Sequence, residues 1–160
     1  MRWRLGVLVT GLMLSPWMVR AEPPAFSMQA GYWGLGPNAE HALAVQLELR
    51  LGVRWWWVRP TAGLLQSTDG TQYVFAGVLL EIPLFWGLTL SPGFAPGIRT
   101  MDGQRDLGSL VLFKSSVELG LPLFPGLRGL VSFAHISNGK LAKPNPGIEL
   151  ILFGLELQLE

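Results

Sequence analysis

Apolar and polar residues alternate along much of the chain. Between residues 42 and 51, every odd position from 43 onward is Leu or Val, whereas the even positions carry Ala, Gln, Glu and Arg. Residues 155–160 repeat the pattern, with Leu at the odd positions and Glu or Gln at the even ones. Side chains two apart in a strand share a face, whereas a helix would mix these charges with the leucines. The alternation therefore predicts strands that have one apolar and one polar face.

Eight strand-like segments follow one another from Phe26 onward, separated by turn-forming Gly, Pro, Asn and Asp. We expect strands at about Phe26–Leu35, Ala42–Leu51, Arg54–Leu65, Gln72–Ile82, Trp86–Phe94, Leu107–Leu121, Leu127–Ser137 and Ile148–Leu159. Eight strands of about 10 residues each are typical of the smallest membrane barrels. The predicted fold class is all-β, an eight-stranded antiparallel transmembrane β-barrel.

The connections between the expected strands alternate in character. Those after the second, fourth and sixth strands are short, whereas the others are more polar, and the longest is Ala95–Asp106. Bacterial barrels have short turns in the periplasm and longer loops outside. Both chain ends are then periplasmic, and the seventh strand ends at the outer rim. Trp55–Trp57 lie beside a chain reversal, which favours an interfacial aromatic girdle over ordinary core aromatics.

The composition agrees with an exported membrane protein. Hydrophobic residues make up 49% of the 160 residues, charged residues 14%, and there is no cysteine. After the N-terminus, the chain lacks the run of roughly 18 apolar residues that a membrane-spanning helix needs. Residues 1–21 have the features of a signal peptide, with Arg2 and Arg4 before an apolar stretch and a small-residue cleavage site; the alternative is an uncleaved anchor. We expect residues 22–160 to form a single barrel domain in the Gram-negative outer membrane.

The charge balance does not indicate a nucleic-acid partner. The chain has 12 Lys and Arg against 11 Asp and Glu, and three of the arginines fall in the predicted leader. No basic stripe of the kind that binds nucleic acid is present in the sequence. Four charged residues of the strands are expected to form salt bridges inside the barrel: Glu48, Arg50, Glu81 and Glu118.

Candidate catalytic residues lie on both sides of the last loop. His135 and Ser137 are two apart, a loop of Gly, Pro and Asn follows, and Glu149 begins the next apolar run. An antiparallel return can place Glu149 opposite His135, with their Cβ atoms roughly 4.5–5.5 Å apart. A nucleophile, a base and a carboxylate that orients the base would then share one patch. A lone His-x-Ser is weak evidence, and the loop and the in-phase glutamate make the pattern more specific.

Parity predicts on which side of the barrel this patch lies. His135, Ser137 and Glu149 are odd-numbered, as are the apolar residues of the last strand, whereas Glu156 and Gln158 are even-numbered. If polar residues face the interior, the three candidates face lipid near the outer rim. Ionisable groups on a lipid face are costly and indicate a functional role. A site in this position suits a substrate that is itself a membrane lipid.

The same residues carry a resemblance to a known family. His135-Ile-Ser137-Asn138 and Pro144-Asn145-Pro146-Gly147-Ile148-Glu149 resemble the motif of the PagL family of outer-membrane lipid A 3-O-deacylases. The resemblance implies an eight-stranded barrel that hydrolyses the acyl ester at the 3 position of lipid A, in lipopolysaccharide of the outer leaflet, without a metal or other cofactor. It further implies that Ser137 is the nucleophile, His135 the base and Glu149 the third member of a triad, and that Asn138 and Asn145 shape the site.

Two further groups of candidate residues follow from this chemistry. Ester hydrolysis needs hydrogen-bond donors to the oxyanion, and the phosphates of lipid A need cationic partners. The Asn138 side chain or the amides near Gly139 and Lys140 are candidate donors. Basic residues expected on the outer loops are candidate phosphate contacts, with ordinary solvated loop charge as the alternative: Arg99, Arg105, Lys140 and Lys143.

Two other functions remain open at this point. One is an outer-membrane phospholipase, and the other is a non-catalytic barrel that serves adhesion or membrane integrity. One feature departs from many outer-membrane barrels, which end on an aromatic residue, because this chain ends in Leu159-Glu160.

Overall fold

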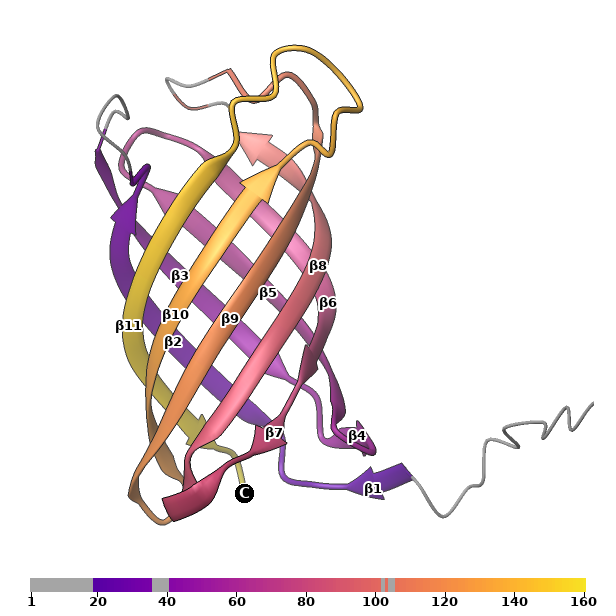
Figure 1. Ribbon diagram of the computed structural model, residues 1–160, viewed down its shortest axis with the longest axis vertical. Helices are drawn as coiled ribbons and strands as arrows, with labels where there is room; N and C mark the ends of the chain where they lie inside the picture. The colour runs from indigo at the N-terminus through magenta and orange to yellow at the C-terminus, as the bar shows by residue number, and fades with distance from the viewer. Residues whose placement is uncertain (1–18, 36–40, 102, 104–105) are drawn as a thin grey trace, which may run out of the picture.

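The computed structural model describes residues 19–35, 41–101, 103 and 106–160. Within them, eight long strands form a tilted barrel (Figure 1). They are β2 (Ala25–Trp33), β3 (Ala42–Arg50), β5 (Val58–Ser67), β6 (Gln72–Leu80), β8 (Thr89–Met101), β9 (Val111–Phe124), β10 (Leu127–Ser137) and β11 (Ile148–Gln158). Shorter elements lie at the end that holds the C-terminus: β1 (Val19–Ala21), β4 (Val53–Trp55), β7 (Ile82–Pro83) and the 3₁₀ helix η2 (Phe85–Gly87).

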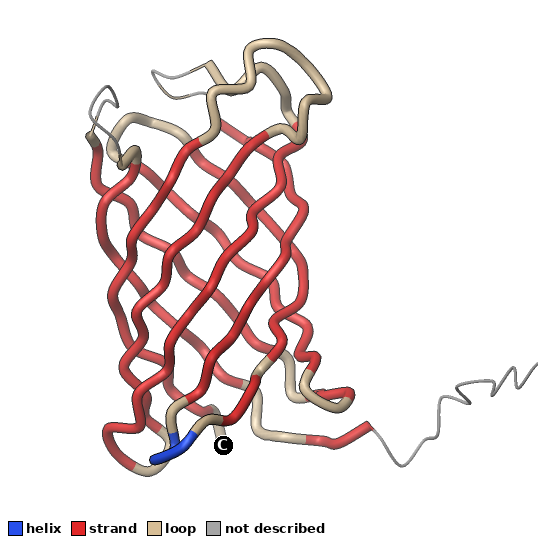
Figure 2. Tube along the Cα trace, viewed as in Figure 1, coloured by secondary structure: helices blue, strands red, loops and turns tan. Residues whose placement is uncertain are grey.

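The sheet closes on itself. Its order runs from β3 through β2, β11, β10, β9, β8 and β6 to β5, and β5 pairs again with β3. All of these pairings are antiparallel, and Figure 2 shows the strands winding steeply around the barrel. The predicted fold class is therefore confirmed. Among the described residues, no helix has the length and apolar character needed to cross a membrane.

The N-terminal leader is only partly described. Its last three expected residues form β1, which pairs with β4. Residues 1–18 of the expected signal peptide lie outside the described residues.

The third strand begins later than the sequence predicted. Its expected start at Arg54 was wrong, because Arg54 lies in the short strand β4 and β5 begins at Val58, after a reversal at Trp56 and Trp57. Trp56 has a φ of 56°, a left-handed conformation that strands do not contain. All three tryptophans are exposed, and this agrees with the interfacial girdle and not with core aromatics.

The fifth strand is longer than expected, and the sixth is shifted along the chain. β8 continues through residues 95–101, which were predicted to be loop because of their Pro and Gly content. Pro96 has no N–H to donate, and the β6–β8 ladder is interrupted between Phe75↔Gly97 and Val78↔Phe94. Leu107, the expected start of the sixth strand, is instead a buried loop residue before β9.

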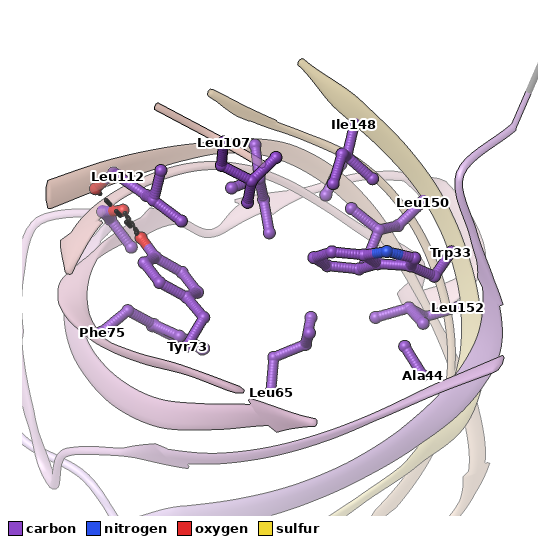
Figure 3. Packing of buried hydrophobic residues seen from close by; sticks show 13 residues of the cluster. Trp33, Ala44, Leu65, Tyr73, Phe75, Leu107, Leu112, Ile148, Leu150 and Leu152 are labelled. Carbon is purple, nitrogen blue, oxygen red and sulfur yellow. Dashed lines mark hydrogen bonds between the residues drawn. The ribbon is translucent and has the colours of Figure 1, made fainter. Parts of the chain in front are cut away.

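Two groups of buried side chains occupy the interior of the barrel, one apolar and one ionic. Figure 3 shows the apolar cluster near the outer end, where Trp33, Leu65, Tyr73, Ile148 and Leu150 meet across the barrel. All of the cluster's labelled residues are buried. Leu107 and Leu112 complete the cluster beneath the outer loops.

Toward the C-terminal end, the interior is ionic. The Arg50 guanidinium lies 2.6 Å from Glu118, 3.3 Å from Glu48 and 3.8 Å from Glu81, and it also pairs with Glu156. The salt bridges predicted for Glu48, Arg50, Glu81 and Glu118 are thereby confirmed. Further cations share the charge, because Lys114 lies 3.5 Å from Glu48, Arg59 lies 3.4 Å from Glu81 and Arg128 lies 3.5 Å from Glu156. Such pairing offsets part of the cost of burying charge.

Candidate active site

His135 and Glu149 face each other across neighbouring strands. They are a cross-strand pair of β10 and β11, and His135 Nδ1 lies 3.2 Å from Glu149 Oε1. Their side chains are 44% and 42% exposed. With a proton on Nδ1, the ring donates to the carboxylate and leaves Nε2 as the free base.

Ser137 is the last residue of β10 and shares the outward face with His135. The inward neighbour Ile136 is fully buried, whereas the outward Phe133 is 50% exposed. The arrangement follows the predicted parity and places all three candidates on the outer surface near the rim. No hydrogen bond joins Ser137 to His135 within the described residues; such contacts often tighten only when substrate is bound.

Asn138 organises the loop between β10 and β11. Its side chain is fully buried, and Nδ2 donates to the carbonyls of Leu107, Ala142 and Pro144 at 2.9–3.1 Å. Its backbone amide donates to Asn145 Oδ1 at 3.0 Å. Both asparagines therefore shape the loop beside Ser137.

The donor role expected of the Asn138 side chain does not fit this geometry. An amide nitrogen has two hydrogens, and three carbonyls already share them. The Lys140 amide is also occupied, because it donates to Asn138 Oδ1 at 2.9 Å. Gly139 remains a candidate donor: it is exposed, and no described residue accepts a hydrogen bond from its amide.

Gly147 brings the loop backbone against the imidazole. A Cβ atom built on Gly147 would lie 2.6 Å from His135 Cε1 and 3.3 Å from Nε2. The residue also has a φ of 66°, which favours glycine. The sequence indicated only a turn at this glycine, and its contact with the imidazole was missed.

The fold separates the three basic candidates that the structure describes. Lys140 and Lys143 are exposed on the loop beside Ser137. Arg99 is half-buried, and the alternation of β8 places it on the inward set with Ala95 and Gly97. Its position does not fit a contact with lipid outside the barrel. Arg105 lies outside the described residues.

Two aromatic residues that the sequence did not single out flank the site. Phe113 of β9 is the cross-strand partner of Ser137, and its ring stacks on Phe94 of β8 with centroids 6.0 Å apart. Their relation to Ser137 depends on strand register, which the sequence alone does not give. No group of three or more His, Cys, Asp or Glu in the described part of the chain is placed to hold a metal ion.

The comparison with protein families bears on this site directly. Residues 29–158 match the family model described as lipid A 3-O-deacylase (PagL). The chain belongs to the PagL family. The match includes the whole of the loop and the three triad candidates, and the β-barrel is the fold of an integral outer-membrane protein.

Two solved structures share the barrel. The crystal structure of the outer membrane enzyme PagL has a TM-score of 0.66 and 19% identity, covering 84% of this chain and 99% of that one. A structure from the de novo design of transmembrane β-barrels has a TM-score of 0.60 and 10% identity, covering 88% and 98%. At these identities, the likeness shows the fold alone. Among curated proteins, none matches the sequence.

Proposed function

We propose that the protein is a serine esterase that hydrolyses the 3-O-linked acyl chain of lipid A in the outer leaflet. The observation that carries this proposal is the His135–Glu149 contact of 3.2 Å beside Ser137, on the lipid-facing side of a PagL-family barrel. Membership of the family supports lipid A as the substrate, and the outward position gives a lipid direct access from the membrane.

The residues support a two-step mechanism. Glu149 orients His135 and stabilises its cation, and His135 Nε2 accepts the Ser137 hydroxyl proton as the serine oxygen attacks the ester carbonyl. The Gly139 amide is the proposed donor to the resulting oxyanion. His135 then returns the proton to the departing sugar oxygen, which leaves an acyl-serine.

Water completes the cycle. His135 removes a proton from water, the hydroxide attacks the acyl-serine, and the proton returns to Ser137 as the fatty acid leaves. The products are a free fatty acid and lipid A with a hydroxyl at its 3 position. Lys140 and Lys143 are exposed on the adjoining loop, and we propose that they contact the phosphates of lipid A.

Mass spectrometry of lipid A tests the proposal. Lipid A from cells that express the protein should lack one 3-hydroxyacyl chain, and cells that express Ser137→Ala should retain it. Lysophospholipid with intact lipid A would identify a phospholipase instead. No change in either lipid class would indicate a non-catalytic barrel.

A further inference from the structure

Ser115 of β9 is a second serine beside the catalytic histidine, and the mechanism above does not use it. The strand register pairs Ser115 with His135 on one side and with Phe94 on the other. Glu149, His135 and Ser115 therefore form a row across β11, β10 and β9. This row could not be predicted from the local pattern, because Ser115 is distant in the chain from the His-x-Ser motif.

The surroundings of Ser115 are unusual for a hydroxyl group. Ser115 is exposed on the outward face of β9, and no described residue forms a hydrogen bond with its side chain. Phe94 and Val117, which are each 49% exposed, and Phe133 lie around it on the same face. A hydroxyl that faces hydrocarbon without a partner is costly, so a ligand that supplies the partner would relieve this cost.

The position of Ser115 relative to Ser137 indicates which ligand group it meets. Ser137 pairs with Phe113, and Ser115 is two residues further along β9 toward the C-terminal end of the barrel. Such diagonal neighbours are roughly 7–8 Å apart. An acyl chain whose ester carbon lies at Ser137 must run in this direction to enter the membrane. A hydroxyl on the third carbon, separated from the ester carbon by one methylene, comes within hydrogen-bond reach of Ser115.

We infer that Ser115 is a specificity-determining residue that binds the 3-hydroxyl group of the acyl chain. This inference rests on the proposed esterase function. In this arrangement, the hydroxyl group of Ser115 forms a hydrogen bond with the substrate hydroxyl. The stacked rings of Phe94 and Phe113 lie at the edge of the site on the β8 side. The site then prefers a 3-hydroxyacyl ester over an unsubstituted acyl ester of the same length.

Two variants that are isosteric with each other test the inference. Ser115→Thr keeps the hydroxyl and adds a methyl group, whereas Ser115→Val has the same shape as the threonine variant but a methyl group in place of the hydroxyl; both residues are favourable in strands. The folded barrel in detergent micelles is assayed on glucosamine esterified at O3 with either 3-hydroxytetradecanoate or tetradecanoate. Wild type and Ser115→Thr should prefer the hydroxylated ester by about five- to tenfold in kcat/KM, as expected for one neutral hydrogen bond. Ser115→Val should lose this preference, chiefly through slower hydrolysis of the hydroxylated ester.

The other outcomes are distinguishable. If wild type hydrolyses both esters and Ser115→Val keeps the wild-type preference, the inference is overturned and the proposed esterase stands. If Ser115→Val loses both activities while Ser115→Thr retains them, the serine acts in the chemistry itself, and the recognition role is also overturned. If wild type hydrolyses neither ester nor lipid A, the proposed function fails.

Discussion

His135 is held by contacts on two sides. Glu149 meets Nδ1 at 3.2 Å, and the backbone of Gly147 lies against the Cε1 edge of the ring. The carboxylate sets the tautomer of the imidazole, and the glycine limits where the ring can lie. Two residues therefore position the base. Glu149 was predicted from the sequence motif, whereas the contact of Gly147 with the ring is visible only in the structure.

Single substitutions in the triad should separate the three roles. Ser137→Ala and His135→Ala should each abolish nearly all lipid A deacylation, because members of a catalytic unit act together. Glu149→Ala should leave a residual activity, although replacing the carboxylate of a serine-protease triad with its amide lowers kcat by about 10⁴-fold. Unchanged heat-dependent gel mobility serves as the folding control. A folded Ser137→Ala variant with near wild-type turnover would point to a water molecule activated directly by His135.

Gly147→Ala should impair catalysis more than it impairs folding. The new methyl group would displace the imidazole of His135, so we expect kcat to fall at least tenfold with little change in KM. Gly126→Ala is the matched control, because Gly126 has a φ of 75° and a Cβ atom built on it would lie 3.9 Å from Gln158 Cβ, an ordinary contact distance. Both variants carry about 1–2 kcal/mol of backbone strain, and equal activity in the two would refute the positioning role of Gly147.

At the scale of elements, the loop between β10 and β11 is fastened to the loop before β9. The Asn138 side chain donates to Leu107 in one loop and to Ala142 and Pro144 in the other. The serine at the end of β10 is thus adjacent to a segment with fixed internal hydrogen bonds. This fastening gives the candidate site a rigid support where the strand ladder ends.

Asn138→Ala should loosen this loop while the barrel remains folded. Each carbonyl that loses a buried donor costs about 1–3 kcal/mol, so the loop should open more often. Trypsin cleavage after the exposed Lys140 should accelerate several-fold, because cleavage follows the population of the open form. Asn145→Ala removes one hydrogen bond, to the Asn138 amide, and should have a smaller effect. Cleavage of Asn138→Ala at the wild-type rate would contradict the fastening.

Strand periodicity explains why much of this arrangement was predictable. The pairing of His135 with Glu149 follows from the length of the loop between them and from the alternation of apolar and polar residues in the two strands. A shift of the pairing by one residue would turn every side chain of a strand to the opposite face of the sheet. The boundaries of β5 and β8 were harder to predict from residue preferences. Tryptophan favours strands, but Trp56 and Trp57 form a turn before β5; proline favours loops, but Pro96 lies within β8. The neighbours contributed by β9, Phe113 and Ser115, depend on pairing between distant segments and could not be derived from local pattern.

At the scale of the whole molecule, a buried ionic network around Arg50 connects the strands. Its guanidinium contacts Glu48, Glu81, Glu118 and Glu156, which come from β3, the segment after β6, β9 and β11. The cation therefore links strands on different sides of the barrel. Removing it would leave several carboxylates buried together without their common partner.

Arg50→Met should strongly destabilise the folded barrel. Breaking a buried ion pair by removing one partner typically costs about 3–5 kcal/mol. Arg128→Met is the control and should cost less, because Arg128 is partly exposed, lies 3.5 Å from Glu156, and leaves that carboxylate paired with Arg50 when it is removed. Urea unfolding in detergent, followed by gel mobility, measures the difference. Equal midpoints for the two variants would show that the network is not a major source of stability.

The packed interior has a consequence for the permeability of the membrane that holds the barrel. Trp33, Leu65 and Tyr73 fill the outer half, and the Arg50 network fills the half nearer the C-terminus. We expect these two layers to block the passage of a hydrated ion. In a planar bilayer under voltage, the inserted protein should give no stepwise conductance. A cell could then carry many copies of the barrel without adding open pores to the membrane.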